Sequence, residues 1–370
     1  MIYADNAATT KLDADAFEAM KPYLVSAFGN PSQPYFFAKP AKKALKRARV
    51  TIAECIDAEP EEIYFTSGGT ESDNTAIKSV LYREKNKVIT SQIEHHAILN
   101  ACRSLETLHI PVEYLSVTNK GIVDPKTLEA HLDDQIGLVS IMTANNEIGT
   151  IEPINALCQK AHAKGVLFHT DAVQAVGHIP IDVKALGIDM LSASAHKFNG
   201  MKGTGFLYIK NGVQLHPLID GGAQEKHFRA GTENIAGIVA MATALKKNCD
   251  RMEEAEQKLK TLETIFCQRL NVLGIDYIRN GSDNHLPGNI NISIKNAEGE
   301  MLLHRLDLKG ICISTGSACD SVNTQLSHVI RAINVPKEYA EGTIRITFGW
   351  ENTEEEAIAI ADAIGNVINH

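Results

Sequence analysis

Short apolar strands that alternate with helical segments are the feature that most constrains the fold of this chain. The expected strands cover residues 63–66, 88–90, 138–142, 166–169, 190–193 and 206–209. Several of them are apolar almost throughout, as strands are when both faces of a sheet are covered. Alternation of this kind over about 200 residues predicts a mostly parallel, seven-stranded type of sheet flanked by helices, in an α/β fold.

The helical segments are amphipathic, and their pattern changes along the chain. Residues 41–56 and 155–164 have apolar side chains at helical spacing, and Gly165 follows the second segment in the C-cap position. From residue 245 onward the pattern predicts one long charged helix over 245–273, then strands at 290–294, 311–314 and 343–348 and a last helix at 354–368. We therefore expect a large domain at 15–250 and a smaller α+β domain formed by 1–14 and 251–370.

The charge balance excludes several classes of partner. The 370 residues contain 36 Lys and Arg against 45 Asp and Glu, a formal net charge of −9. Nucleic acids and anionic membrane surfaces require basic patches, so neither is expected as a partner. No apolar run approaches the ~18 residues of a membrane span. The seven cysteines include no C-x-x-C pair, which favours free thiols in a reducing compartment, and we expect a cytoplasmic protein.

A lysine closes one of the apolar strands. Lys197 ends the segment Ser192-Ala193-Ser194-Ala195-His196-Lys197. Burial of an ammonium group is costly, and desolvation lowers the pKa of a lysine and makes it a nucleophile toward carbonyl groups. This segment alone is compatible both with a Schiff-base lysine and with an exposed lysine at a strand end.

Two further segments favour the Schiff-base interpretation. Asp171 follows the strand at 166–169, where a carboxylate can hold the proton of a pyridinium nitrogen, and Gln174 lies on the same face if a helical turn begins there. Taken alone, Asp171 is more often an N-cap residue. The stretch Phe65-Thr66-Ser67-Gly68-Gly69-Thr70-Glu71 is a strand, a glycine turn and a helix start, whose backbone N–H groups bind anions. Together the three segments describe a pyridoxal phosphate pocket at the carboxyl ends of strands.

Histidines near this pocket leave a second interpretation open. His95 could stack on the cofactor ring and move protons. Alternatively, His95, His96, His169 and Asp171 could ligate zinc, although neither the His-His pair nor the His-x-Asp spacing matches a compact zinc pattern. We therefore rank a zinc site lower and expect no intrinsic metal.

Two residues of the C-terminal part also carry chemistry. Cys319 follows the strand at 311–314 and precedes a polar, turn-prone stretch, so its thiol is expected to be accessible, as a nucleophile must be. Arg345 lies in the strand at 343–348 and offers a bidentate fork to a carboxylate, or forms an ordinary surface ion pair.

Ordered motifs along nearly the whole chain resemble those of a known enzyme family. They include Tyr3-Ala4-Asp5-Asn6-Ala7-Ala8-Thr9-Thr10, Gly29-Asn30-Pro31-Ser32, the stretch 65–74, Glu94-His95-His96-Ala97, Ala144-Asn145-Asn146-Glu147-Ile148-Gly149, Asp171-Ala172-Val173-Gln174, Ser194-Ala195-His196-Lys197, Arg229-Ala230-Gly231-Thr232 and 314–319. The chain resembles the pyridoxal-phosphate-dependent cysteine desulfurases of the NifS and IscS type, which are fold type I, class V aminotransferases.

The resemblance implies a role for each matching residue. Lys197 would bind the cofactor covalently, Asp171 would pair with the ring nitrogen, His95 would stack on the ring and Gln174 would contact the phenolate oxygen. The phosphate would be bound by Gly69, Thr70, Ser194 and His196, with Thr232 reaching over from a second subunit. Asn146 and Arg345 would bind the substrate carboxylate, and Cys319 would accept the sulfur.

The resemblance also implies a reaction and partners. L-cysteine would become L-alanine: Lys197 removes the α-proton, and the Cys319 thiolate attacks the substrate sulfur and becomes a persulfide. The sulfur would pass to iron–sulfur cluster assembly or to another acceptor protein, and Cys319 could transiently ligate an iron–sulfur cluster. A homodimer is expected. Alternatives are a selenocysteine lyase or another enzyme of the same family, and, from other classes, a metal-dependent hydrolase or a silent binding module.

Four positions depart from the family pattern. Gln33-Pro34-Tyr35 stands where Ser-x-His is frequent, Lys226 replaces an arginine, Thr347 replaces a serine and Gly69 stands where alanine is common. Because none of these is the lysine, the aspartate or the cysteine, we expect them to affect substrate contacts and phosphate affinity rather than the chemistry.

Overall fold

The computed structural model describes residues 1–315 and 326–368, and a seven-stranded mixed sheet lies at its centre. The strand order is β2-β8-β7-β6-β5-β3-β4. The strands are β2 (Ile63–Thr66), β3 (Lys87–Ser91), β4 (Val112–Leu115), β5 (Ile136–Ser140), β6 (Leu167–Asp171), β7 (Met190–Ser194) and β8 (Gly205–Ile209). The predicted α/β sheet is confirmed. The sequence pattern did not predict β4, an edge strand whose residues are mostly only half-buried.

One reversed strand decides which ends of the sheet meet. The five neighbouring strands β4, β3, β5, β6 and β7 all pair in parallel. β8, in contrast, pairs antiparallel with both β7 and β2. Because two reversals restore the original direction, β2 runs parallel to β7. The carboxyl ends of β2, β3, β5, β6 and β7 therefore lie at the same edge, where open α/β sheets bind their ligands.

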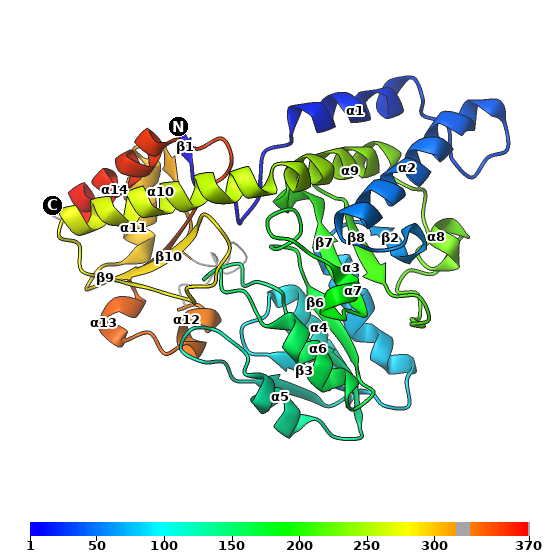
Figure 1. The fold of residues 1–370 in the computed structure, drawn as a ribbon, viewed down its shortest axis with the longest axis horizontal. Helices are drawn as coiled ribbons and strands as arrows, with labels where there is room; N and C mark the ends of the chain where they lie inside the picture. The colour runs from blue at the N-terminus through cyan, green and yellow to red at the C-terminus, as the bar shows by residue number, and fades with distance from the viewer. Residues whose placement is uncertain (316–325, 369–370) are drawn as a thin grey trace.

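Helices cover both faces of this sheet (Figure 1). Neighbouring residues of one strand pack into different hydrophobic clusters: Val88 lies with α3 (Gly69–Lys78) and α4 (His96–Thr107), and Ile89 with the helices of the other face. This alternation follows from the two-residue period of a strand. The remaining helices of this part are α1 (Ala14–Val25), α2 (Lys39–Cys55), α5 (Pro125–His131), α6 (Ile154–His162), α7 (Val183–Leu186), α8 (Gln224–His227) and α9 (Ile235–Asp250).

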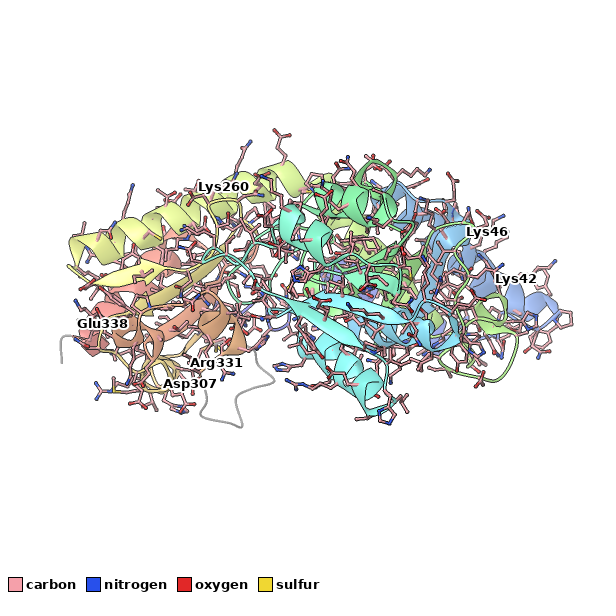
Figure 2. All side chains as sticks on the ribbon, turned by 90° about the horizontal axis from the view of Figure 1, so that it is seen from below. Lys42, Lys46, Lys260, Asp307, Arg331 and Glu338 are labelled. Carbon is pink, nitrogen blue, oxygen red and sulfur yellow. The ribbon has the colours of Figure 1, made fainter. Side chains whose placement is uncertain are left out.

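The amphipathic helices form as predicted, with small shifts at their ends. In α2, Ala44 and Ile52 face the core, while Lys42 and Lys46 extend outward from the helix (Figure 2). The C-cap residue of α6 is Ala163, and not Gly165 as the sequence predicted. Gly165 follows two residues later with a positive φ of 67° and donates its N–H to the carbonyl of His162, so it turns the chain after the helix.

A second sheet and a second hydrophobic core are formed by the C-terminal part. β10 (Asn289–Ile294) lies between β9 (Tyr277–Arg279) and β12 (Thr343–Thr347), and both pairings are antiparallel. β1 (Ile2–Tyr3) pairs in parallel with β11 (Ile311–Cys312), which places the N-terminus in this part (Figure 1). The helices are α10 (Met252–Val272), α11 (Gly299–Asp307), α12 (His328–Ala332), α13 (Lys337–Ala340) and α14 (Glu354–Ile368). The division into domains at 15–250 and at 1–14 with 251–370 stays a proposal.

The prediction of one long helix over 245–273 is wrong. α9 ends at Asp250 and α10 begins at Met252, with Arg251 between them at φ −105° and ψ 10°. The Arg251 guanidinium donates to Asn248 Oδ1 at 2.6 Å and lies 5.0 Å from the centre of the Trp350 ring. Tertiary packing thus sets the break: α9 packs on α1 and α2, while α10 packs on α14. No proline or glycine marks the position, so the periodic pattern runs through it.

Among the described residues, none of the helices combines the length and the apolar composition that a membrane span requires.

Candidate active site

The lysine, the aspartate and the glycine turn line one cavity of about 230 Å³ at the shared edge of the sheet. Asp171 is the last residue of β6, Lys197 ends the short 3-10 helix that directly follows β7, and Gly69 is the first residue of α3 after β2. Parallel strand order therefore brings together side chains that are up to 128 residues apart in sequence (197 − 69). The predicted site residues that line this cavity are Gly69, Thr70, His95, Asn146, Asp171, Gln174, Ser194, His196, Lys197 and Arg345.

Lys197 is half-buried, and backbone carbonyls of the N-terminal segment hold its ammonium group. Its Nζ donates to the carbonyl of Ala8 at 2.9 Å and also to that of Ala7. The Ala7 carbonyl accepts a second hydrogen bond, from Gln174 Nε2 at 3.0 Å. Sequence reasoning did not assign Ala7 and Ala8 to the site. They contribute backbone carbonyls and line the cavity, and alanine side chains give no sign of such a role.

The position of Asp171 is compatible with both interpretations that the sequence left open. It is 5% exposed, and it accepts the backbone N–H of Val173 at 2.9 Å, as a capping carboxylate does. It also faces the cavity. Burial raises the pKa of Asp171 to about 6, while the Val173 N–H and the positive charge of Lys197 oppose the rise. At neutral pH the cavity therefore contains a carboxylate beside an amine.

The start of α3 forms an anion-binding turn. Gly68 is the N-cap residue of this ten-residue helix, and no side chain caps its first N–H groups. A second cavity of about 390 Å³ adjoins the first and shares Gly69, Thr70, Ser194 and His196 with it. A Cβ at Gly69 would lie 2.6 Å from Val173 Cγ2, so the turn packs closely against the chain that follows Asp171. Uncapped N–H groups with hydroxyls on both sides suit a phosphate group.

Two histidines line the cavity, and their rings have different surroundings. Burial, followed by the charges of Lys197 and Lys202, lowers the pKa of His196 to about 4, so this ring is neutral. His95 is the N-cap of α4, and its Nδ1 accepts the N–H of Ala97 at 3.1 Å. A neutral His95 ring consequently carries its proton on Nε2.

The structure groups no metal-ligating side chains. Within residues 1–315 and 326–368, no three His, Cys, Asp or Glu side chains lie together as they would around a metal ion. His169 instead bonds to hydroxyls, with Nδ1 2.8 Å from Ser140 Oγ and Nε2 2.9 Å from Ser192 Oγ. The alternative zinc site at His95, His96, His169 and Asp171 thus has no ligand cluster in the described part of the chain.

Arg345 presents a buried guanidinium to the cavity. The residue is 1% exposed; its Nη2 lies 2.7 Å from Asp5 Oδ1 and its Nη1 donates to the Asn146 carbonyl at 2.9 Å. Its Nε has no hydrogen-bond partner among the described residues. A buried donor of this kind requires an acceptor, and a bound carboxylate would supply one. Sequence reasoning did not single out Asp5 as the partner of Arg345.

Two predicted residues are not placed in the cavity. Cys319 lies outside the described residues, although the chain on either side contacts the site. The N–H of Ser314 donates to the Arg345 carbonyl at 3.1 Å, and Ser327 Oγ donates to Glu147 Oε2 at 2.6 Å. Thr232 is exposed and lines neither cavity of its own chain.

Two of the four departures from the family pattern lie away from the cavity, and two touch it. Lys226 donates to the Glu61 carbonyl and lies 4.9 Å from the centre of the Tyr64 ring. Tyr35 is 50% exposed. Thr347, in contrast, supports the cavity wall, because its Oγ1 accepts the Ala7 N–H at 2.9 Å. Gly69 and Thr347 are therefore the two departures that touch the site.

Comparisons with known proteins agree along the whole chain. A model of the aminotransferase class-V family matches residues 2–360. A cysteine desulfurase IscS of Dictyoglomus turgidum is 48% identical over 371 residues, covering 99% of this chain and 94% of that protein. The solved structure of a NifS-like protein aligns with a TM-score of 0.94 at 35% identity, over 100% of this chain and 99% of that one. A structure of SspA in complex with cysteine aligns with a TM-score of 0.84 at 35% identity, over 94% of this chain and 99% of that one.

Proposed function

The chain belongs to the aminotransferase class-V family and is a cysteine desulfurase, and we propose that it works with pyridoxal 5′-phosphate in the cavity between Asp171 and Lys197. The residues fit this cofactor. The uncapped start of α3 suits its phosphate, the Asp171 carboxylate suits its ring nitrogen, and the amine of Lys197 suits its aldehyde. When bound, the cofactor supplies an electron sink that stabilises negative charge on the carbon next to an amino group.

The side chains around this position would each perform one task. Asp171 holds the proton of the ring nitrogen, His95 covers the ring and Gln174 contacts its phenolate oxygen. The phosphate is held by Gly69, Thr70, Ser194 and His196. Because the His196 ring is neutral above its lowered pKa of about 4, it would offer the phosphate the same N–H donor from mildly acidic to neutral pH.

Arg345 and Asn146 would orient the substrate. The buried guanidinium contacts the Asn146 carbonyl, and Arg345 lines the cavity in which the substrate carboxylate would bind. Desolvation inside the cavity strengthens this charge-assisted contact. With the carboxylate fixed there, Lys197 Nζ takes the proton from the substrate Cα and later returns a proton to the carbon skeleton.

Cys319 would take the sulfur. Its thiolate forms a sulfur–sulfur bond with the substrate as the Cβ–S bond breaks, so that Cys319 becomes a persulfide and the carbon skeleton leaves as alanine after it gains protons. The contacts of Ser314 with Arg345 and of Ser327 with Glu147 support this role, because they anchor both flanks of 316–325 beside the substrate-binding residues.

The proposed partners follow from the same residues. Thr232 is exposed outside its own cavity, which supports a homodimer in which it reaches the phosphate of the neighbouring subunit. The persulfide would pass its sulfur to an iron–sulfur scaffold or another acceptor protein. A reducing compartment such as the cytoplasm would keep the thiols free.

The shared cavity of Lys197 and Asp171 is the observation that carries the proposal. We expect the purified protein to be yellow, to lose this colour in Lys197→Ala, and to form equal amounts of alanine and persulfide sulfur from cysteine. Mass spectrometry after incubation with cysteine should find one additional sulfur on Cys319, which Cys319→Ser would abolish while keeping the colour. Full sulfur transfer by Cys319→Ser, or a colourless wild-type protein, would refute the assignment. Competition between cysteine and selenocysteine separates a desulfurase from a selenocysteine lyase.

A further inference from the structure

Asp73 is a cavity residue to which neither the sequence motifs nor the proposed roles assign a task. It lies in α3, one turn after Gly69, and it lines the same cavity as Asp171 and Lys197. Only 1% of Asp73 is exposed, and its Oδ1 has no hydrogen-bond partner within the described residues. A buried carboxyl oxygen without a donor is costly when it is charged.

Neutral and acidic groups of the neighbouring segments face Asp73. From β6, His169 Nε2 lies 3.8 Å from Asp73 Oδ1. His169 is fully buried, and burial lowers its pKa to about 3, so the ring is neutral. From β7, the Ser192 hydroxyl contributes a hydrogen bond to the Asp73 carboxyl. Glu94, which follows β3, adds a further buried carboxyl.

Asp171 is the neighbour with which Asp73 competes for charge. Asp171 accepts the Val173 N–H at 2.9 Å and lies near the positive charge of Lys197. Among the described residues, Ser192 contributes a side-chain hydrogen bond to Asp73, and burial together with the Asp171 charge raises the pKa of Asp73 well above its ordinary value. Two adjacent carboxyls in a water-poor site do not both ionise. Asp171, which has the Val173 N–H and the nearby charge of Lys197, keeps the charge.

We propose, building on the proposed function, that Asp73 is a positioning residue: it stays protonated next to Asp171 and thereby keeps the negative charge of the pair on Asp171, where the cofactor nitrogen is bound. An ionised Asp73 would instead drive a proton onto Asp171 and remove the charge that holds the ring-nitrogen proton. The pair therefore carries one negative charge, which Lys197 or a bound pyridinium balances.

Nuclear magnetic resonance of the full-length protein with ¹³C-labelled aspartate side chains measures this directly, and Glu94 remains silent because it is unlabelled. Asp73→Asn identifies the Asp73 signal. The reference is Asp13, whose side chain accepts the N–H groups of Asp15 and Ala16 and lies 2.8 Å from Lys247 Nζ. Partial burial opposes the charge of Asp13, but these contacts lower its pKa overall. We expect the Asp73 signal at the protonated position at neutral pH, and the Asp13 signal at the ionised position.

A second readout tests the positioning role. In Asp73→Asn the side chain is neutral at every pH. The absorbance spectrum of the bound cofactor should therefore match that of the wild type near neutral pH. At high pH, any spectral change that the wild type shows as Asp73 ionises should be absent from the variant. An ionised Asp73 signal at neutral pH, or a cofactor spectrum altered by Asp73→Asn below about pH 7, overturns the proposal. Ser192→Ala provides the assignment if Asp73→Asn fails to fold, because it removes the one hydroxyl that bonds to Asp73. The carboxyl signal is independent of turnover, so a protonated Asp73 in a protein without desulfurase activity refutes the function and not the charge assignment.

Discussion

Gly69→Ala tests whether close packing at the phosphate turn, rather than backbone freedom, requires glycine at a position where relatives often have alanine. The added Cβ would lie 2.6 Å from Val173 Cγ2 and 3.7 Å from Ser194 Cβ. Carbon atoms normally pack at about 3.5–4.0 Å, so one of the two chains must move by about 1 Å. Gly69 does not have a positive φ, so the substitution introduces no backbone strain.

The displacement would reach both ends of the proposed cofactor. Val173 donates its N–H to Asp171 Oδ1, so a shift of Val173 disturbs the carboxylate as well as the phosphate turn. Overpacking of this kind costs about 1–3 kcal/mol. We expect cofactor affinity to fall by about 5- to 150-fold, measured by equilibrium dialysis of the apoprotein against pyridoxal phosphate.

Val173→Ala supplies the matched control. It removes the atom that the new Cβ would meet, so the double variant Gly69→Ala/Val173→Ala should recover most of the lost affinity. The double-mutant cycle should give a coupling free energy of about 1–3 kcal/mol, as expected for residues in contact. Wild-type affinity in Gly69→Ala, or strictly additive effects of the two substitutions, would contradict this explanation.

Three further predictions concern binding and stability. Arg345→Lys loses the contacts with Asp5 Oδ1 and the Asn146 carbonyl, so the KM for cysteine should rise about 10- to 100-fold while the cofactor spectrum stays unchanged. An unchanged KM in steady-state kinetics would argue against carboxylate binding by Arg345. Burial raises the pKa of Glu152 from 4.5 to about 8. The folded state therefore binds the Glu152 proton more tightly than the unfolded state does. The stabilisation that this proton provides is complete below the unfolded-state pKa and is lost as the pH rises through about 8. Urea unfolding should therefore show Glu152→Gln to be more stable than the wild type at about pH 8 by at most about 5 kcal/mol, and equal to it near pH 4; the same gap at both pH values would exclude this cause. Glu225→Gln leaves Arg49 and the Phe65 N–H without their carboxylate and should lower the free energy of unfolding in urea by about 3 kcal/mol. Glu59→Gln alters an exposed pair with Lys184 and should leave the free energy of unfolding unchanged, and equal losses in both variants would show that burial of the pair does not matter.

Local sequence patterns predicted the elements well where burial and periodicity coincide. β2 and α14 have the predicted bounds, and the other predicted strands differ by one or two residues at one end or at both ends. The patterns failed where long-range packing decides the conformation. Arg251 interrupts a continuous helical pattern because α9 and α10 pack on different partners, and the reversal of β8 depends on pairing that no local pattern encodes.

Local sequence was enough to identify the residues that are able to do the chemistry: an amine, a carboxylate and an uncapped helix start, each at a strand end, are local properties of the chain. The atoms that complete the site depend on long-range folding. The Ala7 and Ala8 carbonyls, Asp5 and Asp73 lie in recognisable motifs but received no role from the sequence, and they reach the site because the strand order and the return of the N-terminus place them there. Their charges and pKa values are likewise properties of burial, which depends on contacts between distant residues and cannot be read from neighbours along the chain.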